Sequence, residues 1–225
     1  MCSSDLWFLF GFLLGGRGSV ANYFGFLAAG VFAFALIRQS ITAGSRAISN
    51  NEGLIRSIHF PRALLPLAVV AQNFRVYLFS IPLMLFVILV TGEPITWQWL
   101  LAPVGLLLIL MFSTGIAMIM ARVVANAPDL SEVLPLFLRV WGYLSGVMIP
   151  IADRLNRLSV PPWAVLIIEI NPGTVYLNCM RDALINTYDS PGGALNWVLA
   201  VAWAVVMLPL GLWIFWRGEE TYGRG

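Results

Sequence analysis

The reactive and charged side chains are conspicuous in this chain, because 60% of its 225 residues are hydrophobic and only 11% are charged. One cluster of polar residues lies between two long apolar runs, in the segment SNNEGLIRSIHFPRALLP at 49–66. Ser49 and Glu52 have the spacing of a capping box, in which each side chain accepts a hydrogen bond from a backbone N–H at the start of a helix. The pattern predicts a short helix over 49–60, which ends before Pro61.

The residues of this short helix perform no evident chemistry and allow two interpretations. A helix with one apolar face can lie among lipid headgroups. It can also fit a cleft on a soluble partner subunit, and the pattern alone leaves both possibilities open. The apolar face and the residues that flank it are Leu54, Ile55 and Ile58, with Glu52, Arg56 and His59.

A second set of polar and aromatic residues lies within the apolar runs themselves. Charged residues inside a membrane usually face the interior of the helix bundle or a water-filled path. Deep aromatic rings could stack on sugar rings in such a path, although ordinary helix packing accounts for each ring singly. Structural pairing and a channel lining therefore both remain open for these candidates, which are Arg75, Tyr77, Arg139, Trp141 and Tyr143.

Several kinds of chemistry have no support in the sequence. A GxxxxGK[ST] phosphate-binding loop is absent, so we expect ATP and its magnesium ion to be bound elsewhere. His59 is the single histidine, and Cys2 and Cys179 are far apart, so we expect no metal site and no disulfide. The outer acidic residues are too dispersed for acid–base catalysis, and we predict no catalytic or cofactor-binding residue in this chain. Those acids are Asp153, Glu169, Asp182 and Asp189.

The elements that position these residues are membrane-spanning helices. A soluble domain carries about 25% charged residues, more than twice the share found here. A span needs about 20 apolar residues. We predict five such spans, although Arg139 weakens the fourth: Ala21–Ile37 (extending as far as Ile41), Leu64–Val90, Trp99–Ala121, Leu130–Ile149 and Leu195–Trp216.

The first residues suggest a sixth helix that is incomplete. The apolar run Trp7–Leu14 would extend only about 12 Å as a helix, which is too short to cross a bilayer. The preceding Met1–Leu6, MCSSDL, looks like the translated end of a sequencing adapter. We therefore expect residues 1–6 to be non-native and the chain to be truncated at its N-terminus.

The orientation follows from the arginines, since cytoplasmic loops of membrane proteins carry an excess of basic residues. All 13 basic residues are arginine. Alternation of the spans places seven on one side, which we predict to be cytoplasmic, and four on the other. The first set is Arg38, Arg46, Arg56, Arg62, Arg122, Arg217 and Arg224, and the second is Arg17, Arg154, Arg157 and Arg181.

The stretch 151–193 is too broken to be a span. PPWAVLIIE offers a short apolar piece, and NPGTVYLNCMRDALIN reads as a helix with Asn171 as the N-cap and Pro172 as its first residue. Two half-length helices on the outer side form either a re-entrant pair buried against protein or helices lying flat at the membrane surface. The pattern does not decide between them.

Four motifs resemble the permease subunits of ABC-2 polysaccharide exporters, a family that exports O-antigen, teichoic acid and cell-wall galactan. They are NEGLIRSIHFPRALLP, PDLSEVLPLFLRVWGYLSGVMIP, NPGTVYLNCMRDALI and FWRGEETYGRG, in that order. The resemblance implies a single transmembrane domain over 1–225 with six transmembrane helices. It also implies a cytoplasmic coupling helix at 49–60, bearing Ser49, Glu52, Leu54, Ile55, Arg56 and Ile58, and two re-entrant helices within 151–186.

The resemblance further implies a machine of two permeases and two separate ATPase subunits in the cytoplasmic membrane. The chain itself would be no enzyme, and a lipid-linked glycan would pass between the two permeases. Two alternatives remain at this point. One is an ABC-2 exporter of drugs or small lipids, and the other is a membrane enzyme acting on a lipid-linked sugar.

Overall fold

The computed structural model describes residues 22–51, 53, 62–148, 161–188 and 190–218. No strand occurs among these residues, which confirms the predicted all-α class. The elements are α2 (Tyr23–Ser45), η1 (Ser49–Asn51), α4 (Leu64–Val90), η2 (Trp97–Leu101), α5 (Ala102–Asn126), α6 (Leu130–Leu144), α8 (Pro162–Ile170), α9 (Pro172–Leu184) and α10 (Ala194–Gly218).

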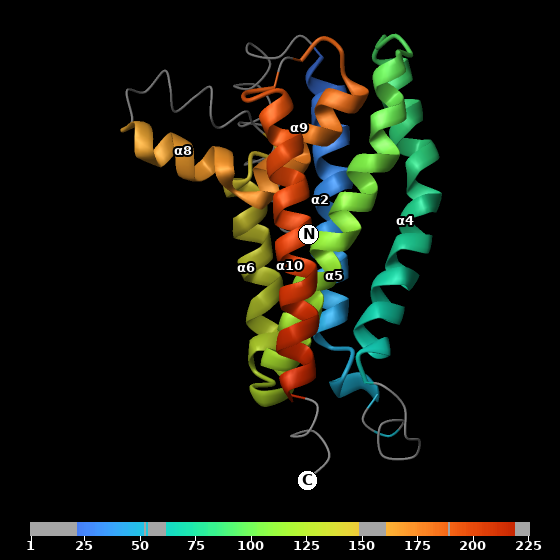
Figure 1. Ribbon diagram of the computed structural model, residues 1–225. Coiled ribbons are helices and arrows are strands. Elements are labelled where there is room, and N and C mark those ends of the chain that lie inside the picture. The colour runs from blue at the N-terminus through green and yellow to red at the C-terminus, as the bar shows by residue number, and fades with distance from the viewer. Residues whose placement is uncertain (1–21, 52, 54–61, 149–160, 189, 219–225) are drawn as a thin grey trace, which may run out of the picture.

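Within the described residues, four stretches are long and apolar enough to cross a membrane: α2, α4, η2 together with α5, and α10. Figure 1 shows them as an elongated bundle, in which α2 packs on α5, α4 flanks α2, and α10 lies along α5. α2 and α5 are mostly buried, whereas α4 and α10 expose most of their apolar side chains. Such exposure suits helices that face lipid.

The α5–α10 pair crosses closely because glycines occupy the crossing. A Cβ atom on Gly115 would overlap the backbone of Met207 and Leu208. A Cβ atom on Gly211 would overlap the backbone of Gly115 in turn. Small residues that allow two backbones to touch are a common basis of helix association in membranes.

The predicted boundaries agree with the structure to different degrees. The predicted span Leu64–Val90 coincides with α4. α2, in contrast, ends at Ser45, beyond both of the predicted C-terminal bounds, Ile37 and Ile41. Gly44 lies within this extension and packs so tightly that a Cβ atom there would lie 2.6 Å from Ala117 Cβ. Tertiary packing therefore prolongs the helix through a polar stretch. Arg38, which directly follows the shorter predicted bound at Ile37, is therefore a helical residue.

α6 is shorter than the span predicted over Leu130–Ile149. It ends at Leu144 in a Schellman motif, in which Val147 N–H donates to Gly142 O and Gly146 N–H donates to Tyr143 O. Gly146 adopts a φ of 75°, a left-handed conformation that glycine tolerates best. The helix extends about 22 Å, which is less than the roughly 30 Å of a bilayer core. The predicted run Trp7–Leu14 lies outside the described residues.

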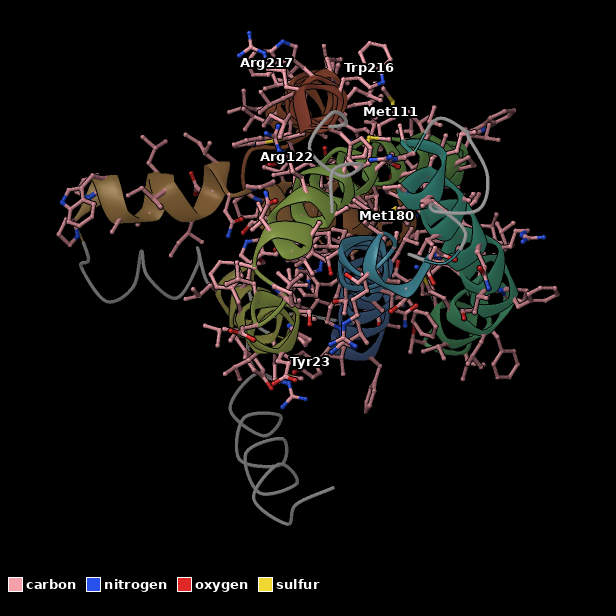
Figure 2. The ribbon with its side chains drawn as sticks, turned by 90° about the horizontal axis from the view of Figure 1, so that it is seen from below. Tyr23, Met111, Arg122, Met180, Trp216 and Arg217 are labelled. Carbon is pink, nitrogen blue, oxygen red and sulfur yellow. The ribbon has the colours of Figure 1, made fainter. Side chains whose placement is uncertain are left out.

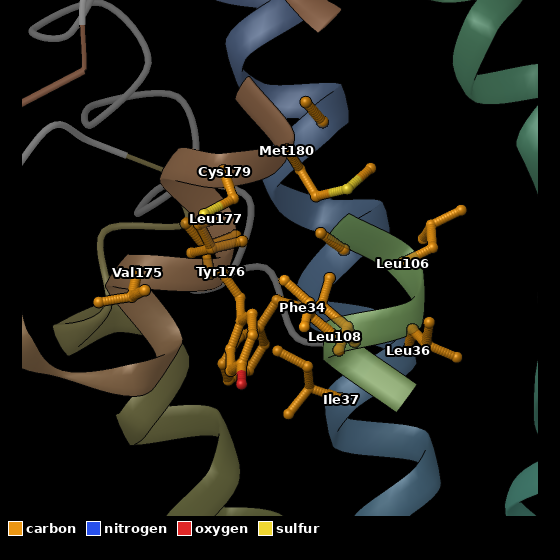
Figure 3. Packing of buried hydrophobic residues seen from close by; sticks show 14 of the residues in the cluster. Phe34, Leu36, Ile37, Leu106, Leu108, Val175, Tyr176, Leu177, Cys179 and Met180 are labelled. Carbon is orange, nitrogen blue, oxygen red and sulfur yellow. The ribbon is translucent and has the colours of Figure 1, made fainter. Parts of the chain in front are cut away.

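α9 begins as predicted and inserts into the bundle. Asn171 caps it, with its side chain accepting a hydrogen bond from Gly173 N at 3.1 Å, and Pro172 is the first helical residue. Nearly all of α9 is buried against α2, α5 and α10, and Figure 3 shows its apolar side chains meeting those of α2 and α5. α8 instead projects sideways from the bundle (Figure 1) and exposes apolar side chains, including Trp163 and Ile167.

Candidate functional site

The predicted coupling helix lies largely outside the described residues. Ser49 is exposed in η1, a single turn that follows closely after the end of α2. Asn51 fixes this turn, because its Nδ2 donates to Ala47 O at 2.8 Å. The coupling role of the segment stays a prediction, and its other predicted residues, Glu52, Leu54, Ile55, Arg56 and Ile58, are not among those described.

The five predicted channel residues do not share one surface of the chain. Arg139 and Tyr143 are exposed one turn apart on α6, and Arg75 is exposed on α4. Tyr77 is only 4% exposed and belongs to the apolar core. Trp141 is half-buried, with its ring 5.5 Å from that of Phe34. A lining role for these five residues stays a prediction.

One end of the bundle gathers cationic side chains. α2 ends there, α4 begins there, and α5 and α10 also end there (Figure 1). Figure 2, viewed from this side, shows Arg122 on α5 and Arg217 on α10. We call this the arginine-rich end; its described arginines near helix termini are Arg46, Arg62, Arg122 and Arg217, and Arg38 lies two turns further inside α2.

A cleft of about 540 Å³ opens between α2, α4 and α6 toward this end. Arg38 and Arg46 come from α2 and its C-cap, and Arg139 comes from α6. No aspartate or glutamate is among the described residues that line it. We call it the arginine-lined cleft, and its other polar lining residues are Gln39, Thr42, Asn50, Asn51 and Asn73.

Arg46 in the wall of the cleft bonds a carbonyl that a proline leaves free. Pro135 lies inside α6 and has no N–H to donate to the carbonyl of Ser131, four residues earlier. Arg46 Nη2 donates to that same Ser131 oxygen at 2.8 Å. The arginine thus satisfies the acceptor that the proline leaves free, and the bond joins the ends of α2 and α6.

The opposite end of the bundle contains a different arginine. Arg181 of α9 is 1% exposed, and its Nη2 donates to Gly146 O at 2.9 Å and to Val147 O at 3.0 Å. Its guanidinium lies 3.5 Å from the centre of the Phe26 ring. Gly30 leaves room for it, since a Cβ atom there would lie 2.5 Å from Arg181 Nη2. A guanidinium keeps its proton at neutral pH, so Arg181 is a buried cation.

Glu93 forms a second polar centre at the opposite end. It is 4% exposed and accepts hydrogen bonds from Asn22 Nδ2 at 2.9 Å, Asn186 N at 3.1 Å and Thr187 Oγ1. Asn22 also caps α2, because its Oδ1 accepts a hydrogen bond from Gly25 N. One carboxylate therefore joins the start of α2, the turn after α4 and the connection from α9 to α10.

Sequence reasoning missed the roles of Arg181, which it counted only among the outer arginines, and of Glu93, which it did not single out. Their partners lie far along the chain, and no local pattern marks them. The arginine-lined cleft did leave a signal, because Arg38, Thr42 and Arg46 follow one another at four-residue spacing and lie on one helix face. That signal was hidden by ending the helix too early.

Together, the apolar helices, the inserted half-helix α9 and the arginine-lined cleft define an all-α, multi-pass membrane protein. Comparison with known proteins gives its family: residues 6–185 match the ABC-2 type transporter family, and the chain belongs to it. It is therefore a transport permease by family.

A curated relative is similar along most of the chain. The O-antigen export system permease protein RfbA of Myxococcus xanthus is 28% identical over 208 residues. The match covers 92% of this chain and 78% of that protein.

Proposed function

We propose that this chain is the membrane subunit of an ATP-driven exporter that moves a lipid-linked polysaccharide across the cytoplasmic membrane. The observation that carries this proposal is the similarity to an O-antigen export permease along 92% of the chain. The arginine bias supports the cytoplasmic assignment of the arginine-rich end.

In this proposal the energy comes from a separate ABC ATPase subunit, which binds ATP and magnesium. Two copies of this chain and two ATPase subunits form the complex, and the glycan passes between the two copies. The segment 49–60 transmits the ATPase movement to the bundle through its apolar face. We also infer that α8 and α9 form a re-entrant pair, and the burial of α9 among α2, α5 and α10 supports this for α9.

Deletion of the gene tests the exported substrate. Cells that lack it are expected to lose a surface polysaccharide and to accumulate its lipid-linked form inside, and a plasmid copy should restore export. Normal surface polysaccharide together with new sensitivity to drugs would contradict the proposal and indicate a small-molecule exporter.

The coupling segment is tested by the double variant Leu54→Asp and Ile58→Asp, which places two charges on its apolar face. We expect insertion into the membrane to continue while export and co-purification of the ATPase subunit are lost. The matched control is Leu54→Val with Ile58→Val, which keeps the face apolar and should retain both. Unchanged export by the aspartate variant would exclude this coupling surface.

A further inference from the structure

The arginine-lined cleft carries more positive charge than the described residues around it neutralise. Asp129 and Glu132 at the start of α6 are near in sequence to Ser131, yet within the described part of the chain neither forms an ion pair with Arg38, Arg46 or Arg139. Three guanidinium groups around one cleft repel one another, and their attraction for an anion is strong where water is partly excluded. The charge balance therefore favours a negatively charged ligand.

Two buried polar atoms in the wall of the cleft also lack partners. Thr42 Oγ1 and Arg46 Nε are inaccessible to solvent and make no hydrogen bond with any described residue. Leaving such buried groups without a hydrogen-bond partner is unfavourable. Thr42 lies one turn from both Arg38 and Arg46, so the unsatisfied atoms belong to the same helix face as two of the cations.

The arginines lie at two depths. α2 runs toward the arginine-rich end and α6 runs away from it, and they are joined where Arg46 donates to Ser131 O. Arg38 and Arg139 are each eight residues from that bond, in the direction of the opposite end, which corresponds to about 12 Å along each helix. Cations spaced along the cleft suit an elongated anion better than a single small ion.

We propose that the arginine-lined cleft binds the phosphate groups of a phosphate-bearing lipid headgroup, namely the phosphate or diphosphate that joins the exported glycan to its lipid carrier. This inference rests on the proposed function for the identity of the carrier. Arginine suits the task, because its planar guanidinium forms paired, charge-assisted hydrogen bonds with phosphate oxygens. The cleft volume lies within the usual range of roughly 300–1,000 Å³ for ligand pockets.

The test uses the full chain in phosphatidylcholine nanodiscs and a polyprenyl diphosphate as the probe. The variant is Arg38→Gln with Arg139→Gln, because neither arginine makes a described contact that holds the fold, whereas Arg46 does. We expect the dissociation constant of the probe to rise about tenfold or more. Arg38→Lys with Arg139→Lys keeps the charge and should recover part of the affinity. Arg217→Gln removes a charge at the same end outside the cleft and should bind within about twofold of the unaltered chain.

Equal binding by the glutamine variant and the unaltered chain would overturn the proposal. Two further arms identify the source of the phosphate. Arginine-dependent competition by phosphatidylglycerol as strong as the probe itself would overturn the assignment to the glycan carrier. Equally strong competition by inorganic pyrophosphate would overturn the requirement for a lipid.

The outcome is separable from that of the proposed function. If deletion of the gene abolishes export but probe binding does not depend on Arg38 and Arg139, this inference alone fails. If the cleft binds the diphosphate but deletion leaves surface polysaccharide unchanged, the proposed function fails and the anion site stands.

Discussion

The two ends of the bundle place their charged side chains in different surroundings: Arg181 and Glu93 are buried, whereas Arg38, Arg46 and Arg139 are partly or fully exposed. At the opposite end, Arg181 meets two backbone carbonyls and the Phe26 ring, and Glu93 accepts hydrogen bonds from three residues. At the arginine-rich end, the cleft gathers three arginines without a described acidic partner. A buried charge held by several partners joins elements of the fold, whereas accessible charges around a cleft can meet a ligand.

The largest expected effect comes from removing the satisfied cation. Arg181→Met should lower the free energy of unfolding by about 2–6 kcal/mol, because the carbonyls of Gly146 and Val147 lose their buried donor, at about 1–3 kcal/mol for each. Thermal unfolding in detergent would measure this loss as a lower midpoint. Arg217→Met is the matched control, since Arg217 lies near the surface with its guanidinium over Trp213. A similar midpoint for both variants would remove the distinction between the two ends.

A smaller effect is expected at the carboxylate of the opposite end. Glu93→Gln keeps the shape of the side chain but removes its charge and one acceptor oxygen, so we expect a loss of about 2 kcal/mol. Glu132→Gln, on the exposed start of α6, should leave the unfolding midpoint unchanged. The same detergent melting assay reports both. If Glu93→Gln melts with the unaltered protein, the carboxylate does not hold the three segments together.

The smallest effect on stability is expected in the arginine-lined cleft. Arg38→Gln with Arg139→Gln should change the free energy of unfolding by no more than about 0.5 kcal/mol, since neither guanidinium has a described partner to lose. This variant is also the one expected to lose the diphosphate probe. A large drop in its melting temperature would show that the cleft is structural and would erase the contrast with Arg181.

Much of the fold could be predicted from the sequence because the bilayer imposes a simple pattern. The predicted span Leu64–Val90 has the same bounds as α4, and Asn171 with Pro172 correctly predicted the start of α9. The early end of α6 could have been suspected from Gly146, which accepts the left-handed conformation of a helix end.

The polar centres were harder to predict, because each depends on residues far apart in the sequence. Arg181 is matched with carbonyls 34 and 35 residues away, and Glu93 with an asparagine 71 residues away. No spacing rule connects such pairs. The arginine-lined cleft could be predicted in part. Arg38 and Arg46 follow the helical period of α2, but the third arginine, Arg139, comes from α6 and has no sequence relation to them.

The glycine crossing of α5 and α10 has a mechanical consequence. Because Gly115 and Gly211 bring the two backbones into contact, sliding or rotation of one helix against the other would drive peptide groups into each other. We therefore expect α5 and α10 to move as one rigid lever during a transport cycle. Because the cleft is lined by α2, α4 and α6, a change in its width would then come from movement of these three helices relative to one another.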